Sequence, residues 1–140
     1  MRHIKIKFII LIIFSLTFLA TSCSDDDDLS ANVTLTEGVN GDIGGDFTGN
    51  GGNASRTFIW QNDLSTADYN ADITTSAIGL FQMIVKDSNG NTVLDRSLNG
   101  IDESDTYSGV TSSGDAGIWT VTISVTNFSG DGSFTLSEGN

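Results

Sequence analysis

The chain has 140 residues, 18 acidic and 6 basic side chains, a formal charge of −12, one Cys and one His. Its length corresponds to one domain, and a single Cys with a single His cannot supply the usual ligands of a zinc site. The excess of carboxylates argues against a nucleic-acid partner, because phosphate binding depends on Lys and Arg.

The first 22 residues have the pattern of a secretory signal peptide. Arg2, Lys5 and Lys7 precede an apolar run over residues 8–20. As a helix this run would be about 20 Å long, shorter than the roughly 30 Å hydrocarbon core of a bilayer. A basic start, a short apolar run and small residues before a boundary predict a cleaved signal peptide over residues 1–22. A retained membrane helix is the alternative.

The boundary sequence Ala20-Thr21-Ser22-Cys23 resembles the lipobox of bacterial lipoproteins, although that family more often has Leu where Ala20 stands. The resemblance implies a diacylglyceryl group on the Cys23 sulfur and cleavage before Cys23. It also implies acylation of the new amino terminus by a fatty acid such as palmitate. Ordinary cleavage would instead leave a free thiol, which is a liability in an oxidising compartment.

An acidic run follows the cysteine, made of Ser24, Asp25, Asp26, Asp27 and Asp28. A block of like charges is normally a solvated tail. Directly after a lipobox cysteine it also resembles the surface-export signal of Bacteroidota lipoproteins. That resemblance implies an outer-membrane protein displayed on the cell surface. An outer-membrane lipoprotein that faces the periplasm is the alternative.

Removal of the signal peptide changes the chemistry available to the chain. Residues 23–140 keep Arg56, Lys86 and Arg96 as their only cations beside all 18 acids, a formal charge of −15, and they contain no His. Mechanisms that need a His base or a free thiol are therefore excluded, and we predict that the protein is not an enzyme. We assign residues 23–32 to an acidic tether and residues 33–140 to a folded domain.

Several short segments in the first half of the domain favour β-strands. Residues 33–36, 56–61 and 71–75 are weak candidates with β-branched and aromatic side chains. Residues 38–52 are rich in Gly, which predicts either a mobile loop or an edge region that tolerates glycine.

A stronger pattern begins at residues 78–86, which are apolar on both faces and predict a central strand covered on both sides. Residues 87–91 are a turn, residues 92–98 return as a strand, and residues 106–110 form a short edge strand.

The clearest strand is residues 118–128. Trp119, Val121 and Ile123 point to one side, and Thr and Ser alternate with them. Residues 133–137 follow as a further strand, and residues 127–132 join the two segments as a hairpin connection.

Many short strands separated by turns, without an amphipathic helix, predict an all-β fold with a single antiparallel β-sandwich. An Asp-x-x-Gly-x-x-Val-Leu hairpin and a Gly-x-Trp-x-Val-x-Ile strand lie in the C-terminal half. This half resembles the jelly-roll-like sandwich domains of secreted bacterial hydrolases, such as pre-peptidase C-terminal domains and the P-domains of subtilisin-like proteases. The resemblance supports the fold and assigns no family.

Calcium is the best cofactor candidate, because it prefers carboxylate and carbonyl oxygens. Asp102, Glu103 and Asp105 form an acidic cluster, and Asp42 and Asp46 flank a glycine pair. Solvated loop acids are the alternative explanation. An EF-hand-like start at residues 87–91 lacks the required Gly and closing Glu, so a plain hairpin is favoured. Apart from this candidate Ca²⁺ and the lipid on Cys23, we predict no cofactor.

Aromatic side chains decide whether a glycan could be bound by ring stacking. Trp119 and Trp60 alternate with other apolar residues and are expected in the core. Tyr69 and Tyr107 lie in polar stretches and are the better candidates for exposed glycan platforms.

The sequence thus predicts an outer-membrane lipoprotein that acts as a non-enzymatic binding module, with a glycan or a protein as its partner. A structural envelope protein without a specific ligand is the alternative, and a small hydrolase with two carboxylates is the outsider.

Overall fold

The computed structural model describes residues 28–38, 41–102 and 105–139. The regular elements in these ranges are strands, and all of their pairings are antiparallel, which confirms the predicted all-β class. No helix in these ranges has the length and apolar character needed to cross a bilayer. The strands are β1 (Ala31–Val33), β2 (Thr36–Glu37), β3 (Ile43–Asn62), β4 (Ala67–Ile73), β5 (Ile78–Lys86), β6 (Thr92–Asn99), β7 (Thr106–Val110) and β8 (Gly117–Glu138).

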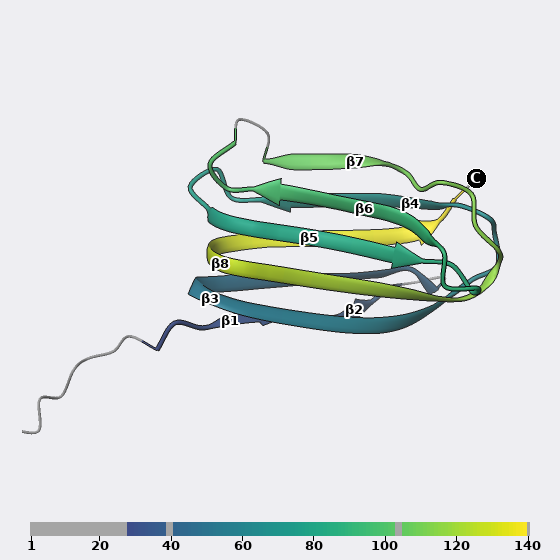
Figure 1. The fold of residues 1–140 in the computed structure, drawn as a ribbon, viewed down its shortest axis with the longest axis horizontal. Helices are drawn as coiled ribbons and strands as arrows, with labels where there is room; N and C mark the ends of the chain where they lie inside the picture. The colour runs from purple at the N-terminus through teal and green to yellow at the C-terminus, as the bar shows by residue number, and fades with distance from the viewer. Residues whose placement is uncertain (1–27, 39–40, 103–104, 140) are drawn as a thin grey trace, which may run out of the picture.

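The two long strands β3 and β8 form one antiparallel ribbon that folds back on itself. Their pairing runs from Ile43 opposite Leu136 to Asn62 opposite Gly117. Figure 1 shows both strands turning back at the same end of the molecule. Near this bend the backbone of Asn127 is left-handed, with φ 46°. The folded ribbon is shared by two layers and connects them into one sheet.

We name the two layers by their strands. Layer A contains β1, β2, residues 43–50 of β3, residues 129–138 of β8, β4 and β7, in that spatial order. Layer B contains residues 52–62 of β3, residues 117–128 of β8, β5 and β6. The protein is therefore an antiparallel β-sandwich, as predicted.

The expected hairpin between residues 118–128 and 133–137 is wrong. Both segments belong to β8, and they lie in different layers instead of pairing with each other. Each half of β8 already has two neighbours, β3 and β5 in layer B and β3 and β4 in layer A. The apolar faces of the two halves are then buried against each other across the core.

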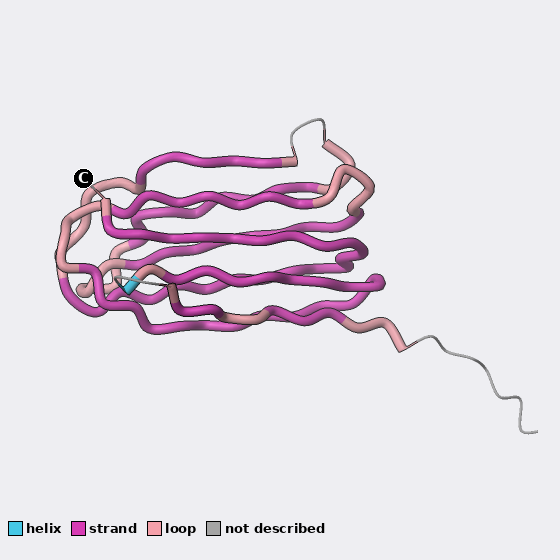
Figure 2. The backbone as a smooth tube through the Cα atoms, turned by 180° about the vertical axis from the view of Figure 1, so that it is seen from behind, coloured by secondary structure: helices cyan, strands magenta, loops and turns pink. Residues whose placement is uncertain are grey.

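The two ends of the sandwich differ. The folded end contains the bend of the ribbon. The chain also crosses there from layer A to layer B, between Ile73 and Ile78, and these two residues pair with nearby positions of β8. The described chain also starts there, because Asn50 Oδ1 accepts a hydrogen bond of 2.6 Å from the Ser30 amide (Figure 2). The far end carries the turn at residues 87–91 and the loop at residues 111–116. The described chain therefore enters the sandwich at the folded end.

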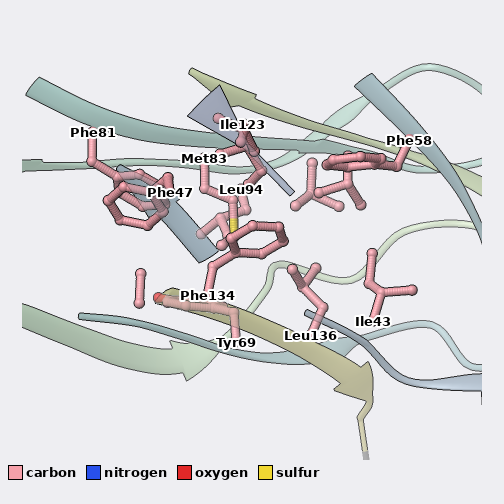
Figure 3. Close-up of a cluster of buried hydrophobic side chains, with 14 of the residues drawn as sticks. Ile43, Phe47, Phe58, Tyr69, Phe81, Met83, Leu94, Ile123, Phe134 and Leu136 are labelled. Carbon is pink, nitrogen blue, oxygen red and sulfur yellow. The ribbon is translucent and has the colours of Figure 1, made fainter. Parts of the chain in front are cut away.

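The core consists of inward-facing residues from both layers (Figure 3). The Phe47 ring of layer A stacks on the Phe81 ring of layer B with centroids 4.3 Å apart. Trp119 is fully buried and Trp60 is 3% exposed, which confirms their predicted core positions. Aromatic pairs of this kind add about 0.5–1.5 kcal/mol beyond the area that they bury.

The other predicted strands are present with small shifts of their bounds. Residues 78–86, 92–98 and 106–110 correspond to β5, β6 and the edge strand β7. Of the weaker candidates, residues 33–36 overlap β1 and β2, residues 56–61 lie within β3, and residues 71–75 overlap the end of β4. Strand β1 begins slightly before the predicted domain start. The glycine-rich stretch is mostly strand, because β3 begins at Ile43 and pairs with β8 on one side and with β1 and β2 on the other.

The prediction that both faces of β5 are covered is wrong. Its inward residues Phe81, Met83 and Val85 are fully buried, but outward Leu80 is 37% exposed and Ile84 is half-buried. Among the described residues, no third layer covers this outer face, because the strands form two layers. The apolar run of β5 thus belongs to a strand whose outer face is open to solvent.

Candidate functional site

The outer face of layer A carries rows of short polar side chains. Asp46 of β3, Ser133 of β8 and Asp72 of β4 are register partners and form one row across three strands. Outward positions alternate with core positions along each strand, so these side chains point away from the core. In the next row Gly44 lies between Thr36 and Thr135.

Two hollows join into one furrow on this face. The larger hollow, about 460 Å³, lies where Gly44 has no side chain between Thr36 and Thr135. The smaller hollow, about 210 Å³, lies beside Asp72 and Asp131. Both are lined by Asp46 and Ser133, so the two hollows adjoin each other. We call this combined feature the furrow.

The strand backbone fixes Asp46 in the middle of the furrow. Its carbonyl oxygen accepts hydrogen bonds from the Thr34 amide at 2.8 Å and from Thr34 Oγ1 at 3.0 Å. Its side chain is exposed. The furrow thus presents an exposed carboxylate on a fixed stretch of backbone, with Ser and Thr hydroxyl groups nearby, a set of groups suited to accept hydrogen bonds from a ligand.

Charge is distributed unequally between the layers. Asp42, Asp46, Asp68, Asp72 and Asp131 lie in layer A or line its furrow. The three cations that follow residue 22 all lie in layer B. Within the described ranges, the furrow therefore faces solvent with carboxylates and without a cation, which disfavours anionic ligands.

The predicted aromatic platforms are not available for stacking. Tyr69 is 7% exposed and Tyr107 is 6% exposed, so the expectation that these rings are exposed is wrong. They pack edge to face, with centroids 5.7 Å apart. Arg96 donates to the Tyr69 hydroxyl at 3.2 Å, and its guanidinium lies 5.1 Å from the Tyr107 ring centre. Burial raises the pKa of the Tyr107 hydroxyl well above its ordinary value of 10.0.

The reason for this error lies in the strand pattern. Tyr69 alternates with Ala67, Ala71 and Ile73 along β4, and all four side chains are buried. Polar residues between them made the stretch resemble a loop, whereas the period of two places the ring inward.

The predicted calcium ligands remain a prediction. Asp102 is exposed and Asp105 is half-buried, while Glu103 lies outside the described residues. Within the described ranges, no group of three or more acidic, His or Cys side chains is arranged to hold a metal ion. Asp42 and Asp46 line the same hollow of the furrow.

The turn at residues 87–91 is a hairpin organised by the Asp87 carboxylate. Asp87 is 4% exposed, and its oxygens accept hydrogen bonds from the amides of Asn89, Asn91 and Asp115 at 3.0, 2.8 and 3.1 Å. The side-chain amide of Asn91 donates to it as well, at 3.1 Å. These bonds, first of all the one from the Asn91 side chain, lower the pKa of Asp87 below its ordinary value of 3.8.

Asp87→Asn should lower the melting temperature at pH 7, and the difference from wild type should shrink as the pH falls. A lowered pKa in the folded state stabilises the fold above the ordinary value of 3.8, and this contribution is lost as the pH falls through the folded-state pKa. Thermal unfolding followed by circular dichroism over an acid series measures the effect. Asp72→Asn, which removes the same charge from an exposed side chain, is the control. A difference that stays constant down to low pH would contradict the assignment.

Comparison with known proteins gives no family. No protein-family model matches the chain, and no curated protein sequence matches it. Among solved structures, TmCBM61 in complex with beta-1,4-galactotriose has a TM-score of 0.45 at 12% identity, over 81% of this chain and 90% of that one.

A family 11 carbohydrate-binding module from Clostridium thermocellum, in complex with a beta-1,3-1,4-mixed-linked tetrasaccharide, has a TM-score of 0.41 at 13% identity, over 80% of this chain and 84% of that one. An isomalto-dextranase of Arthrobacter globiformis T6, complexed with panose, has a TM-score of 0.40 at 16% identity, over 76% of this chain and 23% of that one. These TM-scores are too low to assign the chain to any of these families.

Proposed function

We propose that this chain is a non-enzymatic binding module that a lipid on Cys23 anchors in the outer membrane, with the domain displayed on the cell surface. The proposed ligand is a neutral glycan that lies in the furrow. The observation that carries this proposal is the furrow itself, an open depression in which Asp46 is flanked by hydroxyl groups. Such groups accept and donate hydrogen bonds to the hydroxyls of a sugar.

The negative charge of the furrow favours neutral ligands over anionic ones. The four carboxylates that line the furrow, Asp42, Asp46, Asp72 and Asp131, would repel uronic acids and sulfated sugars, whereas neutral sugars incur no such repulsion. Recognition without an exposed aromatic ring relies on hydrogen bonds, so affinity for a single sugar should be modest. A longer chain gains affinity because it occupies both hollows of the furrow together.

The location rests on the sequence up to residue 28, of which the structure describes only residue 28 itself. The entry of the chain at the folded end supports it, because the outer face of layer A then extends away from the anchor. Because Ser30 and β1 already belong to the fold, about six residues, 24–29, are left for a tether, which could span roughly 20 Å when extended and hold the furrow clear of the membrane surface.

Asp46→Ala should weaken binding to neutral glycans by about tenfold or more. A hydrogen bond to a charged group contributes about 1.5–3 kcal/mol, and about 1.4 kcal/mol corresponds to a factor of ten in affinity. An array of neutral and uronic-acid-containing glycans, probed with the full-length protein in detergent, measures binding and its selectivity. Asp63→Ala is the matched control, since it makes the same replacement at an exposed residue that does not line the furrow.

Two results would contradict the glycan proposal. One is the absence of binding to every neutral glycan on the array, which would favour a structural role in the envelope. The other is an equal loss of binding in the Asp46 and Asp63 variants, which would show that the furrow does not hold the ligand.

A further inference from the structure

The outer face of layer B differs from the furrow side in charge and in apolar content. Its side chains are Ser, Thr and Gln with exposed aliphatic residues among them. Ile59 is 78% exposed, Ile118 is 54% exposed and Leu80 is 37% exposed. Among the outward positions of the four paired strands in this layer, the charged residues are Lys86 and Asp95. Exposed aliphatic residues therefore alternate with short polar side chains across this face.

The outward residues of β5 also lack a cover on this face. Strands that are apolar on both faces are usually covered on both sides. The outward residues Leu80 and Ile84 of β5 are open to solvent in the described structure, although they lie in the middle of layer B between β8 and β6. Two of the outward residues of β5, Leu80 and Ile84, are thus aliphatic and lack a cover, while Gln82 and Lys86 alternate with them.

We infer that the outer face of layer B packs against the same face of a second copy of this chain. The charge distribution favours this occupant. The domain over residues 33–140 has 14 acidic and 3 basic side chains, a formal charge of −11, so two copies repel each other strongly if their acidic layer A faces meet. Contact through layer B instead joins two nearly neutral faces and keeps the carboxylates of both copies on the outside.

The size of the face is sufficient for a weak dimer. Four strands about 4.8 Å apart give a width of about 19 Å, and five outward rows from Leu80 to Gln61 give a length of about 27 Å. This corresponds to roughly 500 Å² per copy, or about 1,000 Å² for the pair, the lower limit for a specific interface. Confinement of both copies to one membrane would raise their effective concentration and favour such an interface.

The position at which the chain enters the domain determines how the two copies are oriented in the dimer. This step rests on the proposed lipid anchor. Both copies must enter from the same membrane, so both folded ends must lie on the same side. A two-fold axis parallel to the strands satisfies this requirement. With the axis between β8 and β5, Thr122 lies opposite Ile84 of the second copy, because these two residues are register partners within each chain.

Pairing through the free edge of β3 in layer B is the competing geometry. Antiparallel pairing of two such edges would place the two chain entries at opposite ends, which one membrane does not allow. Arg56 lies on the inward side of this edge strand, with its guanidinium 5.3 Å from the centre of the Phe58 ring and a hydrogen bond of 2.9 Å to the Val33 carbonyl. Inward-pointing charges on edge strands oppose edge-to-edge association.

Cysteine cross-linking on intact cells tests this inference with the full-length chain. Thr122→Cys, treated with a short bis-maleimide, should give a covalent dimer of twice the chain mass. Thr135→Cys is the matched control, because it replaces the same residue type on the same strand but on the outer face of layer A. Adding Ile84→Glu to the Thr122 variant should reduce the dimer band at least about tenfold, because it places a charge in the contact. A thermal melt of each variant verifies folding.

Several results would overturn the inference. They are the absence of a dimer band with Thr122→Cys, equal bands at the two positions, or a product that contains a different protein. The anchor is tested separately, because a Cys23→Ser variant that stays in the membrane fraction contradicts the anchor whatever the cross-linking pattern shows.

Discussion

A Cys23→Ser variant should leave the membrane fraction and appear in the soluble fraction of the same cells. In the lipobox that residues 20–23 resemble, the cysteine sulfur carries the diacylglyceryl group, and serine cannot replace it in that reaction. Each buried methylene contributes about 0.8 kcal/mol, so several acyl chains hold a protein far more firmly than one chain does. Loss of all of them should therefore shift the protein almost completely.

Cell fractionation with immunoblotting measures this shift, and Ser24→Ala, which keeps the cysteine, is the control. Incorporation of a labelled palmitate analogue should disappear in the Cys23 variant and persist in the control. On intact cells, an external protease should remove the wild-type domain if it is displayed on the surface. Protection from that protease would contradict surface display and favour an orientation toward the periplasm.

Gly79→Ala should destabilise the fold by about 3 kcal/mol or more. Gly79 follows the crossing from layer A to layer B and has φ +95°, a conformation that costs an L-residue about 1–2 kcal/mol. A Cβ atom there would lie 2.3 Å from the Asn127 carbonyl oxygen, which belongs to the paired backbone of β8 and has little freedom to move. The Gly79 carbonyl also accepts a hydrogen bond of 2.9 Å from the Gly100 amide.

Gly90→Ala provides the matched control for the Gly79 variant. Gly90 has a similar φ of +84° in the turn at the far end, but a Cβ atom added there would meet no other atom within 4 Å. We therefore expect a loss of about 1–2 kcal/mol from backbone strain alone. Chemical denaturation of both variants measures the difference. Equal losses in the free energy of unfolding would show that close packing around Gly79 contributes nothing beyond the backbone strain.

Elements with a strong local signal could be predicted from the sequence. Residues 78–86 match β5, and the Asp-x-x-Gly turn that follows it is a hairpin, because alternation and turn chemistry act over a few residues. The core positions of Trp60 and Trp119 were predictable for the same reason. Tyr69 and Tyr107 were not placed correctly, since polar neighbours masked the period of two along β4 and β7.

The furrow could not be located from the sequence. It joins Thr36 and Asp46 with Asp72 and Ser133, which lie far apart along the chain and meet through the pairing of β3, β8 and β4. Asp42 and Asp46 were noted as an acidic pair, but nothing local indicates which partners lie across the strands. Glycine-rich residues that suggested a loop belong to a paired strand because neighbouring strands supply the hydrogen bonds.

By itself, the sequence determined the strands, the low cation content of the chain after residue 22 and the resemblance to a lipoprotein address in the first 28 residues, since each depends on neighbouring residues or on composition. Only the tertiary structure decided that one ribbon folds over to form both layers, that four carboxylates line the furrow in one layer, and that the other layer exposes aliphatic side chains. The physical reason is that strand pairing and layer packing are set by contacts between segments far apart in the chain, and a local pattern of alternating residues fits many such arrangements equally well.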